Sequence, residues 1–227
     1  MAHPPGRARA AQELAVRLRA DSPHLDVSTR SVPEPIAHGL AAESHSADLV
    51  VVGSPSDGDR AAPALAVTAQ ARCPVVAVPP GAVWEDDLPV VVGTDGGHLA
   101  DAAVLAAFAL AAALGTGVRV VCCTLGAPVT GPRSASVEQA TFSVVGRCAE
   151  QYPDVPLDVR IARSHVVSGL VRHAALASML VVGSHSTGDD SIGHRLLHRG
   201  PGPVVLIGPL APTHRRPVPL GCDPAVE

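Results

Sequence analysis

The chain has 227 residues, of which 47% are hydrophobic, 17% charged and 2% aromatic, and its formal net charge is −4 at pH 7. This hydrophobic content excludes a disordered chain, and the length suffices for one large or two small domains. The negative net charge argues against a duplex-binding surface, and the scarcity of aromatic rings argues against a stacking platform for single-stranded bases, so no nucleic-acid partner is expected.

Two further classes of protein are disfavoured by the apolar runs and the cysteines. The longest apolar run, Ala102 to Leu114, is too short to cross a bilayer, and the residues after Met1 show no signal peptide, so a cytoplasmic protein without membrane contact is expected. The five cysteines are odd in number and lack CxxC spacing. We therefore expect core thiols rather than disulfides or a redox centre.

The first part of the chain, residues 1–80, predicts three helices and three strands. Leu14 and Leu18 share one face of the first predicted helix, and short apolar runs predict the later strands. In chain order, the predicted elements are a helix over 8–20, a strand over 25–30, a helix over 36–44, a strand over 48–52, a helix over 63–71 and a strand over 75–78. Residues 81–88, which follow Pro79 and Pro80 and contain three acidic residues, are expected to be a linker.

The second part, residues 89–209, predicts five strands that alternate with helices. The strands are expected over 89–92, 118–123, 157–162, 179–182 and 204–207, with helices over 99–114, 136–151 and 167–177 and a short helix before the last strand. Most of these strands are apolar runs without alternation, as in parallel sheets covered on both faces. The fold class is therefore α/β, with a Rossmann-like, doubly wound parallel sheet. The proline-dense residues 210–227 are expected to be a mobile tail.

An internal repeat relates the two parts. The run from Asp48 to Ser54 matches the run from Met179 to Ser184, and Cys73 to Val78 matches Gly202 to Ile207, at an offset of about 130 residues. The copy in residues 1–80 has no room for the first two strands of the copy in residues 89–209. We therefore expect one partial and one complete unit, packed together.

Three motifs carry a resemblance to a known family. They are Val-Val-Gly-Thr-Asp95-Gly at the end of the first strand of the complete unit, Leu-Val-Val-Gly-Ser-His185 at the end of its fourth, and Pro-Val-Val-Leu-Ile207 in its fifth. With these motifs the chain resembles the universal stress proteins in their tandem form. The resemblance implies a non-enzymatic regulatory or interaction module of the stress response. It also implies that the last strands, Pro74–Val78 and Pro203–Ile207, pair antiparallel within the chain, with a homodimer as a further arrangement.

The resemblance also implies a nucleotide site, since some members of the family bind ATP. By position, Thr94 and Asp95 would lie by the ribose, the backbone of Cys123 by the adenine, and a loop that starts at Gly183 by the phosphates. Further residues of this loop are Ser184, His185 and, at the place of the family's last serine or threonine, Ser191.

The loop departs from the family pattern Gly-x2-Gly-x9-Gly-Ser/Thr. It is about six residues shorter, has serine at the second glycine, and carries Asp189 and Asp190 where phosphates would lie. We therefore expect a degenerate site, with weak or absent binding of ATP and no firm cofactor. A protein that binds ATP or another adenine nucleotide is the alternative, and a nucleotide-handling enzyme is less favoured.

Several of these residues also have a purely structural interpretation. Asp95 fits a turn that caps the next helix, and Gly183 fits a tight exit from a strand. His194 and His198 are spaced i, i+4 on a predicted helix, but the sequence suggests no third ligand, so no metal is expected. No serine, histidine and aspartate can be grouped from the sequence, and no catalytic residue is predicted.

Overall fold

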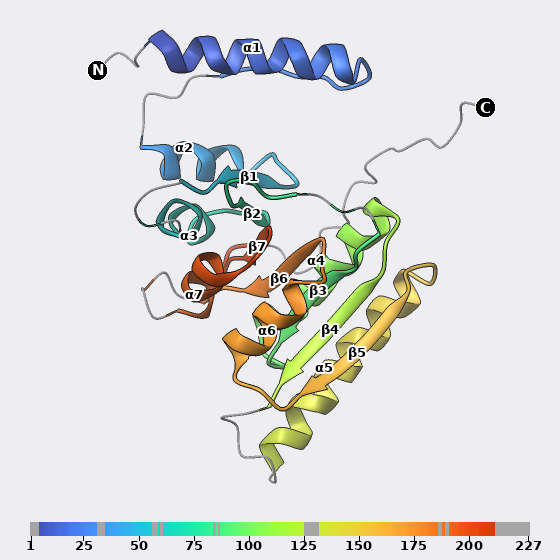
Figure 1. Ribbon diagram of the computed structural model, residues 1–227. Coiled ribbons are helices and arrows are strands. Elements are labelled where there is room, and N and C mark those ends of the chain that lie inside the picture. The colour runs from blue at the N-terminus through green and yellow to red at the C-terminus, as the bar shows by residue number, and fades with distance from the viewer. Residues whose placement is uncertain are drawn as a thin grey trace, which may run out of the picture.

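The structure is a computed structural model that describes residues 5–30, 35–55, 59, 61–83, 85, 87–124, 132–185, 188 and 191–211. Helices and strands alternate along most of the chain (Figure 1). They are α1 (Pro5–Asp21), α2 (Ile36–Glu43), β1 (Val50–Gly53), α3 (Ala62–Thr68), β2 (Val75–Val78), β3 (Val90–Thr94), α4 (His98–Leu114), β4 (Val118–Cys123), α5 (Pro132–Gln151), β5 (Leu157–Ala162), α6 (Val166–Ala174), β6 (Met179–Gly183), α7 (Ile192–Arg199) and β7 (Val204–Ile207).

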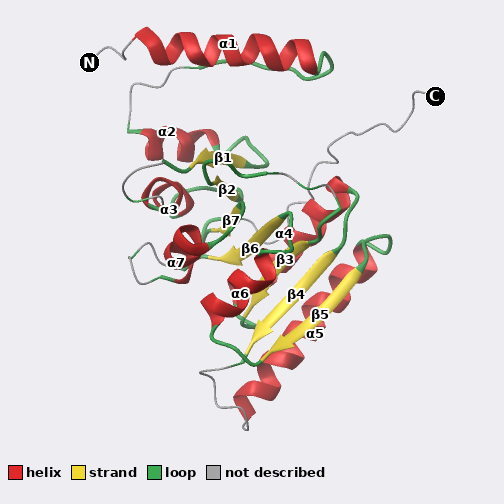
Figure 2. Cartoon of the chain, in the orientation of Figure 1, coloured by secondary structure: helices red, strands yellow, loops and turns green. Residues whose placement is uncertain are grey.

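All seven strands form one sheet, in the order β1-β2-β7-β6-β3-β4-β5 (Figure 2). Every neighbouring pair is parallel except β2 and β7, which run antiparallel with Val75 opposite Leu206 and Val76 opposite Val205. These are the last strands of the two units. The predicted α/β class with a Rossmann-like sheet is confirmed.

Helices cover both faces of the larger part of the sheet. Val90 and Val92 of β3 pack with α4 and α5 on one face, whereas Val91 packs with α6 and α7 on the other. Both faces of β3 are therefore buried, and the strand needs apolar side chains at successive positions. This burial explains why most strands of residues 89–209 could be found as unbroken apolar runs.

The partial unit contributes two strands and not the predicted three. Residues 26–30 form no strand, and the guanidinium of Arg19 in α1 donates a hydrogen bond to the carbonyl of Val27. In the complete unit the corresponding strand, β5, pairs with β4 and with no other described strand. The described residues of the partial unit include no counterpart of β4, so they offer residues 25–30 no strand with which to pair.

The core of the partial unit is small. Val50 and Val52 of β1 and Val75 of β2 pack with Val67 of α3 and with partly buried residues of α2. Helix α1 forms as predicted but lies apart from the sheet (Figure 1), and its Leu14 and Leu18 are exposed. Among the described helices, none combines the length and the hydropathy that a membrane span requires.

The cysteines follow the prediction in part. Cys73, Cys122 and Cys148 are buried free thiols, whereas Cys123 is only half-buried and lines a cavity. The described part of the expected linker, within residues 81–88, contains turns and no helix or strand. From residue 212 onward, the expected tail lies outside the described residues.

Candidate functional site

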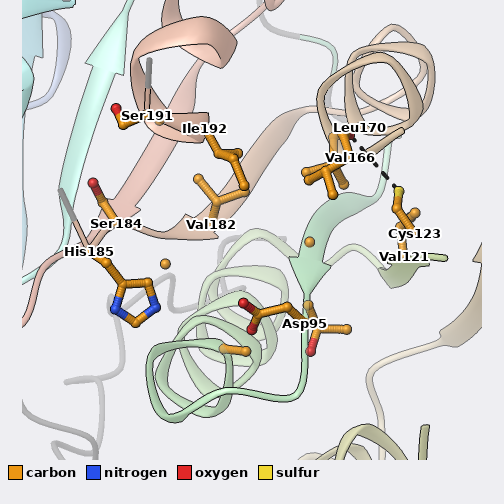
Figure 3. A pocket seen from close by; sticks show the side chains of 15 residues that line it. Asp95, Val121, Cys123, Val166, Leu170, Val182, Ser184, His185, Ser191 and Ile192 are labelled. Carbon is orange, nitrogen blue, oxygen red and sulfur yellow. Dashed lines mark hydrogen bonds between the residues drawn. The ribbon is translucent and has the colours of Figure 1, made fainter. Parts of the chain in front are cut away.

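A cavity of about 420 Å³ lies at the carboxyl ends of β3, β4 and β6 (Figure 3). The chain leaves β3 toward β4 on one side and returns through β6 on the other, and ligands of open α/β sheets bind at such a switch point. The volume is within the range of small-molecule sites. All seven residues predicted for a nucleotide site line this cavity, namely Thr94, Asp95, Cys123, Gly183, Ser184, His185 and Ser191.

Thr94 and Asp95 are held by a turn between β3 and α4. The Asp95 carboxylate accepts a hydrogen bond from the Gly97 amide at 2.9 Å, and the Thr94 hydroxyl accepts one from the Gly96 amide at 3.2 Å. Gly96 has a φ of +72°, which glycine adopts without strain. Gly97 is the N-cap of α4 and makes no side-chain cap. The Asp95 carboxylate thus stabilises the turn and does not cap the helix. Asp95 is exposed, and its carboxylate lies at the cavity (Figure 3).

Cys123 ends β4 on the cavity wall. Its thiol donates to the Val166 carbonyl across 3.9 Å (Figure 3), and the Ser164 hydroxyl donates to its sulfur across 3.8 Å. Burial raises the pKa of the Cys123 thiol, and this effect outweighs the opposing influence of Ser164 and Arg172. The thiol is therefore protonated at neutral pH, unlike the thiolate of a catalytic cysteine.

Gly183 and Ser184 form the exit from β6. A Cβ atom on Gly183 would lie 2.8 Å from the Cβ of Leu99 in α4, so close packing against that helix requires glycine. Ser184 is buried, and its amide donates to the Ile207 carbonyl at 2.9 Å. The structural interpretation of Gly183 as a tight strand exit is thus supported. His185 follows at the exposed rim of the cavity (Figure 3).

Ser191 marks the beginning of α7 on the far side of the loop. Its hydroxyl is the N-cap and accepts a hydrogen bond from the His194 amide at 3.1 Å. Ile192 and Gly193, the first residues of α7, also line the cavity. The positive end of the helix dipole is therefore directed at this space, which favours an anionic group there.

Much of the cavity wall is apolar, and the sequence interpretation missed it. The apolar residues are Ala100, Val121, Val166, Leu170, Val182 and Ile192. Val166 and Leu170 stand at i, i+4 on α6, a spacing that indicates a packed helix face but does not tell core from cavity. These side chains would suit the flat faces of a ring system.

Comparison with known proteins places this geometry in a family. No protein-family model matches the chain. A universal stress protein of Mycolicibacterium smegmatis is 29% identical over 219 residues, which cover 88% of this chain and 74% of that protein. One of Mycobacterium bovis is 30% identical over 184 residues, or 72% of this chain and 62% of that protein. The crystal structure of a universal stress protein from Archaeoglobus fulgidus superposes with a TM-score of 0.64 at 17% identity, over 89% of this chain and 76% of that one, and shares its fold.

The chain belongs to the universal stress protein family. It spans less than two thirds of the length of the Mycobacterium bovis relative.

Within this universal stress protein, the two units repeat the same strand exit. The Ser54 amide donates to the Val78 carbonyl at 2.8 Å, as the Ser184 amide does to that of Ile207. Within its described residues, the partial unit contributes no counterparts of β3 and β4 to the sheet. The residues of β3 and β4 that line the cavity beside Gly183 therefore have no described equivalent beside Gly53, the matching glycine of the partial unit. Asp189 and Asp190, which the sequence analysis placed near the phosphates, lie outside the described residues.

Proposed function

We propose that this universal stress protein is a non-enzymatic regulatory module of the stress response whose cavity is a degenerate nucleotide site. The observation that supports this proposal is the lining of the cavity. Its described lining residues provide the carboxylate of Asp95 and the imidazole of His185 but include no arginine, and the sequence contains no lysine. A triphosphate would have to be held without a fixed cation. ATP should therefore bind weakly or not at all.

The cavity favours a smaller adenine ligand as the second candidate. Its apolar walls suit an adenine ring, the Asp95 carboxylate at the cavity is a hydrogen-bond acceptor for a sugar hydroxyl, and the beginning of α7 offers a site for one anionic group. A nucleoside monophosphate carries fewer charges than ATP, so it repels Asp95 less. The proposed ligand of this second function is thus an adenine nucleoside or monophosphate.

Calorimetric titration of the full chain tests both functions. We expect AMP to bind at least tenfold more tightly than ATP, and Asp95→Ala to weaken AMP binding at least tenfold because a sugar contact is lost. Asp154→Ala, at an exposed turn before β5, is the control and should bind as the unmodified chain does. Micromolar or tighter binding of ATP that is lost in Asp95→Ala would contradict the proposal of a degenerate site.

A non-enzymatic role agrees with the protonated Cys123 thiol, the most nucleophilic type of side chain on the cavity wall. Incubation of the chain with ATP or AMP should leave the nucleotide unchanged, as measured by chromatography. Release of phosphate, pyrophosphate or adenosine that is reduced by Asp95→Ala would assign an enzymatic activity to the cavity instead.

We also propose that the outer edge of β1 recruits a second copy of the chain. No described strand lies beyond β1, and Val51 is 60% exposed there. An open, apolar strand edge tends to pair with another strand. Light scattering coupled to size exclusion should give a dimer, and Val51→Lys should give a folded monomer. A monomer without the substitution would exclude this contact.

A further inference from the structure

Two histidines of the complete unit meet an aspartate of the partial unit. His194 and His198 lie at i, i+4 on α7, and Asp59 lies in the loop that leads into α3. The His198 Nε2 atom is 2.9 Å from Asp59 Oδ1, and the His194 Nε2 atom is 3.5 Å from the same oxygen. One ligand atom of each residue lies within 4.8 Å of the other two. The cluster is therefore compact enough to hold a single ion.

The sheet topology explains why residues so distant in sequence meet. Because β2 and β7 are antiparallel, the carboxyl end of β1 lies at the sheet edge where β7 begins, opposite the edge that carries the nucleotide cavity. Asp59 follows β1, and His198 lies near the end of α7, just before β7. Helices α3 and α7 contact each other across this junction. The aspartate and the histidines thus come from opposite sides of the boundary between the units.

The cluster is fixed in position yet open to solvent. The Asp59 carboxylate accepts hydrogen bonds from the amides of Ala61 at 2.9 Å and Ala62 at 3.3 Å, which hold it at the beginning of α3. The side chains of His194, His198 and Asp59 are 17%, 34% and 43% exposed. An ion can therefore reach the site without any rearrangement of the core.

We propose that Asp59, His194 and His198 form a binding site for a zinc-like divalent transition-metal ion. Two imidazole nitrogens and one carboxylate oxygen are a common ligand set for zinc, and they leave a fourth position for water or another ligand. Zinc–ligand bonds of about 2.0 to 2.2 Å in a tetrahedron separate neighbouring ligand atoms by roughly 3.3 Å. The separations of 2.9 and 3.5 Å at Asp59 bracket this value. Mg²⁺ and Ca²⁺, which prefer oxygen ligands, fit the two imidazoles poorly.

A metal at this site acts as a clamp between the two units. Its ligands come from both sides of the β2–β7 junction, so binding free energy adds to the stability of their association. The clamp is separate from the nucleotide cavity, whose lining contains none of the three ligands. This inference therefore does not rest on the proposed nucleotide function.

Calorimetric titration of the full chain, without any histidine tag, with Zn²⁺ tests the site. We expect one equivalent to bind with micromolar or tighter affinity, and His198→Gln and His194→Gln each to weaken binding at least tenfold. His38→Gln, which makes the same change at an exposed position of α2, is the matched control and should bind as the unmodified chain does. Asp59→Asn should also weaken binding, but Asp59 supports α3 too, so the two histidine variants are decisive.

Two further measurements distinguish this site from loose surface binding. Co²⁺ in place of Zn²⁺ should give the intense visible absorption of a tetrahedral ion, and His198→Gln should abolish it. Zn²⁺ should raise the melting temperature of the unmodified chain and of His38→Gln but not that of His198→Gln. Absence of a bound equivalent, or equal affinity in the unmodified chain and both cluster variants, would overturn the proposal.

Discussion

At the scale of single residues, the two matching strand exits differ in how tightly they are packed. A Cβ atom on Gly183 would come within 2.8 Å of Leu99, whereas one on Gly53 would meet no atom within 4 Å. Gly183→Ala should therefore destabilise the protein by about 1 to 3 kcal/mol, as overpacking does, and Gly53→Ala should change stability by less than about 1 kcal/mol. Urea unfolding of both variants measures the difference. An equal loss of unfolding free energy in the two variants would show that α4 shifts to make room for the extra methyl group.

Single residues also differ in whether their neighbours in the fold could be predicted from the sequence. That the seven residues line one cavity could be predicted, because they lie at or after the carboxyl ends of β3, β4 and β6, and the carboxyl ends of parallel strands meet at one edge. The contact of Asp59 with His198 could not be predicted from the sequence. The two residues are 139 positions apart, and the antiparallel β2–β7 junction brings them together. Likewise, the spacing of Val166 and Leu170 is the same for a helix face in the core and for one that lines a cavity.

At the scale of elements, one ion-pair cluster joins β4 to the edge strand β5. Arg119 and Asp158 are register partners, with 2.9 Å between the Arg119 Nε atom and the carboxylate, and Arg160 lies 2.8 Å from the same group. Burial tends to raise the pKa of Asp158, but hydrogen bonds from the two arginines outweigh it, and the pKa of Asp158 is lowered. The cluster therefore stabilises the folded state more when this carboxyl is ionised.

A lowered folded-state pKa predicts the direction of a pH dependence. The stabilisation by Asp158 should be present above its unfolded pKa of about 3.9 and lost as the pH falls through the lower folded value. Asp158→Asn should reduce the stability at pH 7 by up to about 1 kcal/mol, and the difference from the unmodified chain should vanish near about pH 2. Thermal unfolding across this pH range measures it, with Asp154→Asn as the control. A difference that persists at the acid end would point to lost packing instead.

The strands themselves differ in how well the sequence could predict them. The five strands of residues 89–209 form as expected. In β3, β6 and β7 both faces are buried, so apolar residues occupy successive positions, whereas the edge strand β5 carries Asp158 and Arg160 and is largely exposed or half-buried. The pattern of residues 25–30 indicates a strand equally well, but no pattern within a segment tells whether a neighbouring strand exists. Residues 25–30 therefore form no strand because no described strand lies beside them to pair with, not because their strand propensity is low.

At the scale of the whole molecule, the partial unit depends on the complete one. Val76 of β2 is 6% exposed, lies opposite Val205 of β7, and belongs to the same core cluster as β3 and α4. Val76→Asp would bury an unpaired charge at this junction, which should lower stability by about 3 kcal/mol or more. Limited proteolysis should then cut within residues 35–85 first, while residues 89–209 persist.

The control for this variant is Val83→Asp, which places the same charge on an exposed side chain after β2. It should leave the melting temperature and the proteolytic pattern unchanged. If Val76→Asp also melted as the unmodified chain does, the partial unit would be shown to hold together without the β2–β7 junction.

The antiparallel junction also determines how the sheet would respond to a pulling force. Val50 at the start of β1 lies beside Val75 at the start of β2, which in turn lies opposite Leu206 near the end of β7. The points at which the chain enters β1 and leaves β7 are therefore at the same edge of the sheet. A force that pulls on the chain before β1 and on the chain after β7 would break the hydrogen bonds between these strands one after another. It would not load all of these hydrogen bonds at once, as shearing along the strands does. The partial unit should detach at low force, long before the parallel strands of the complete unit yield.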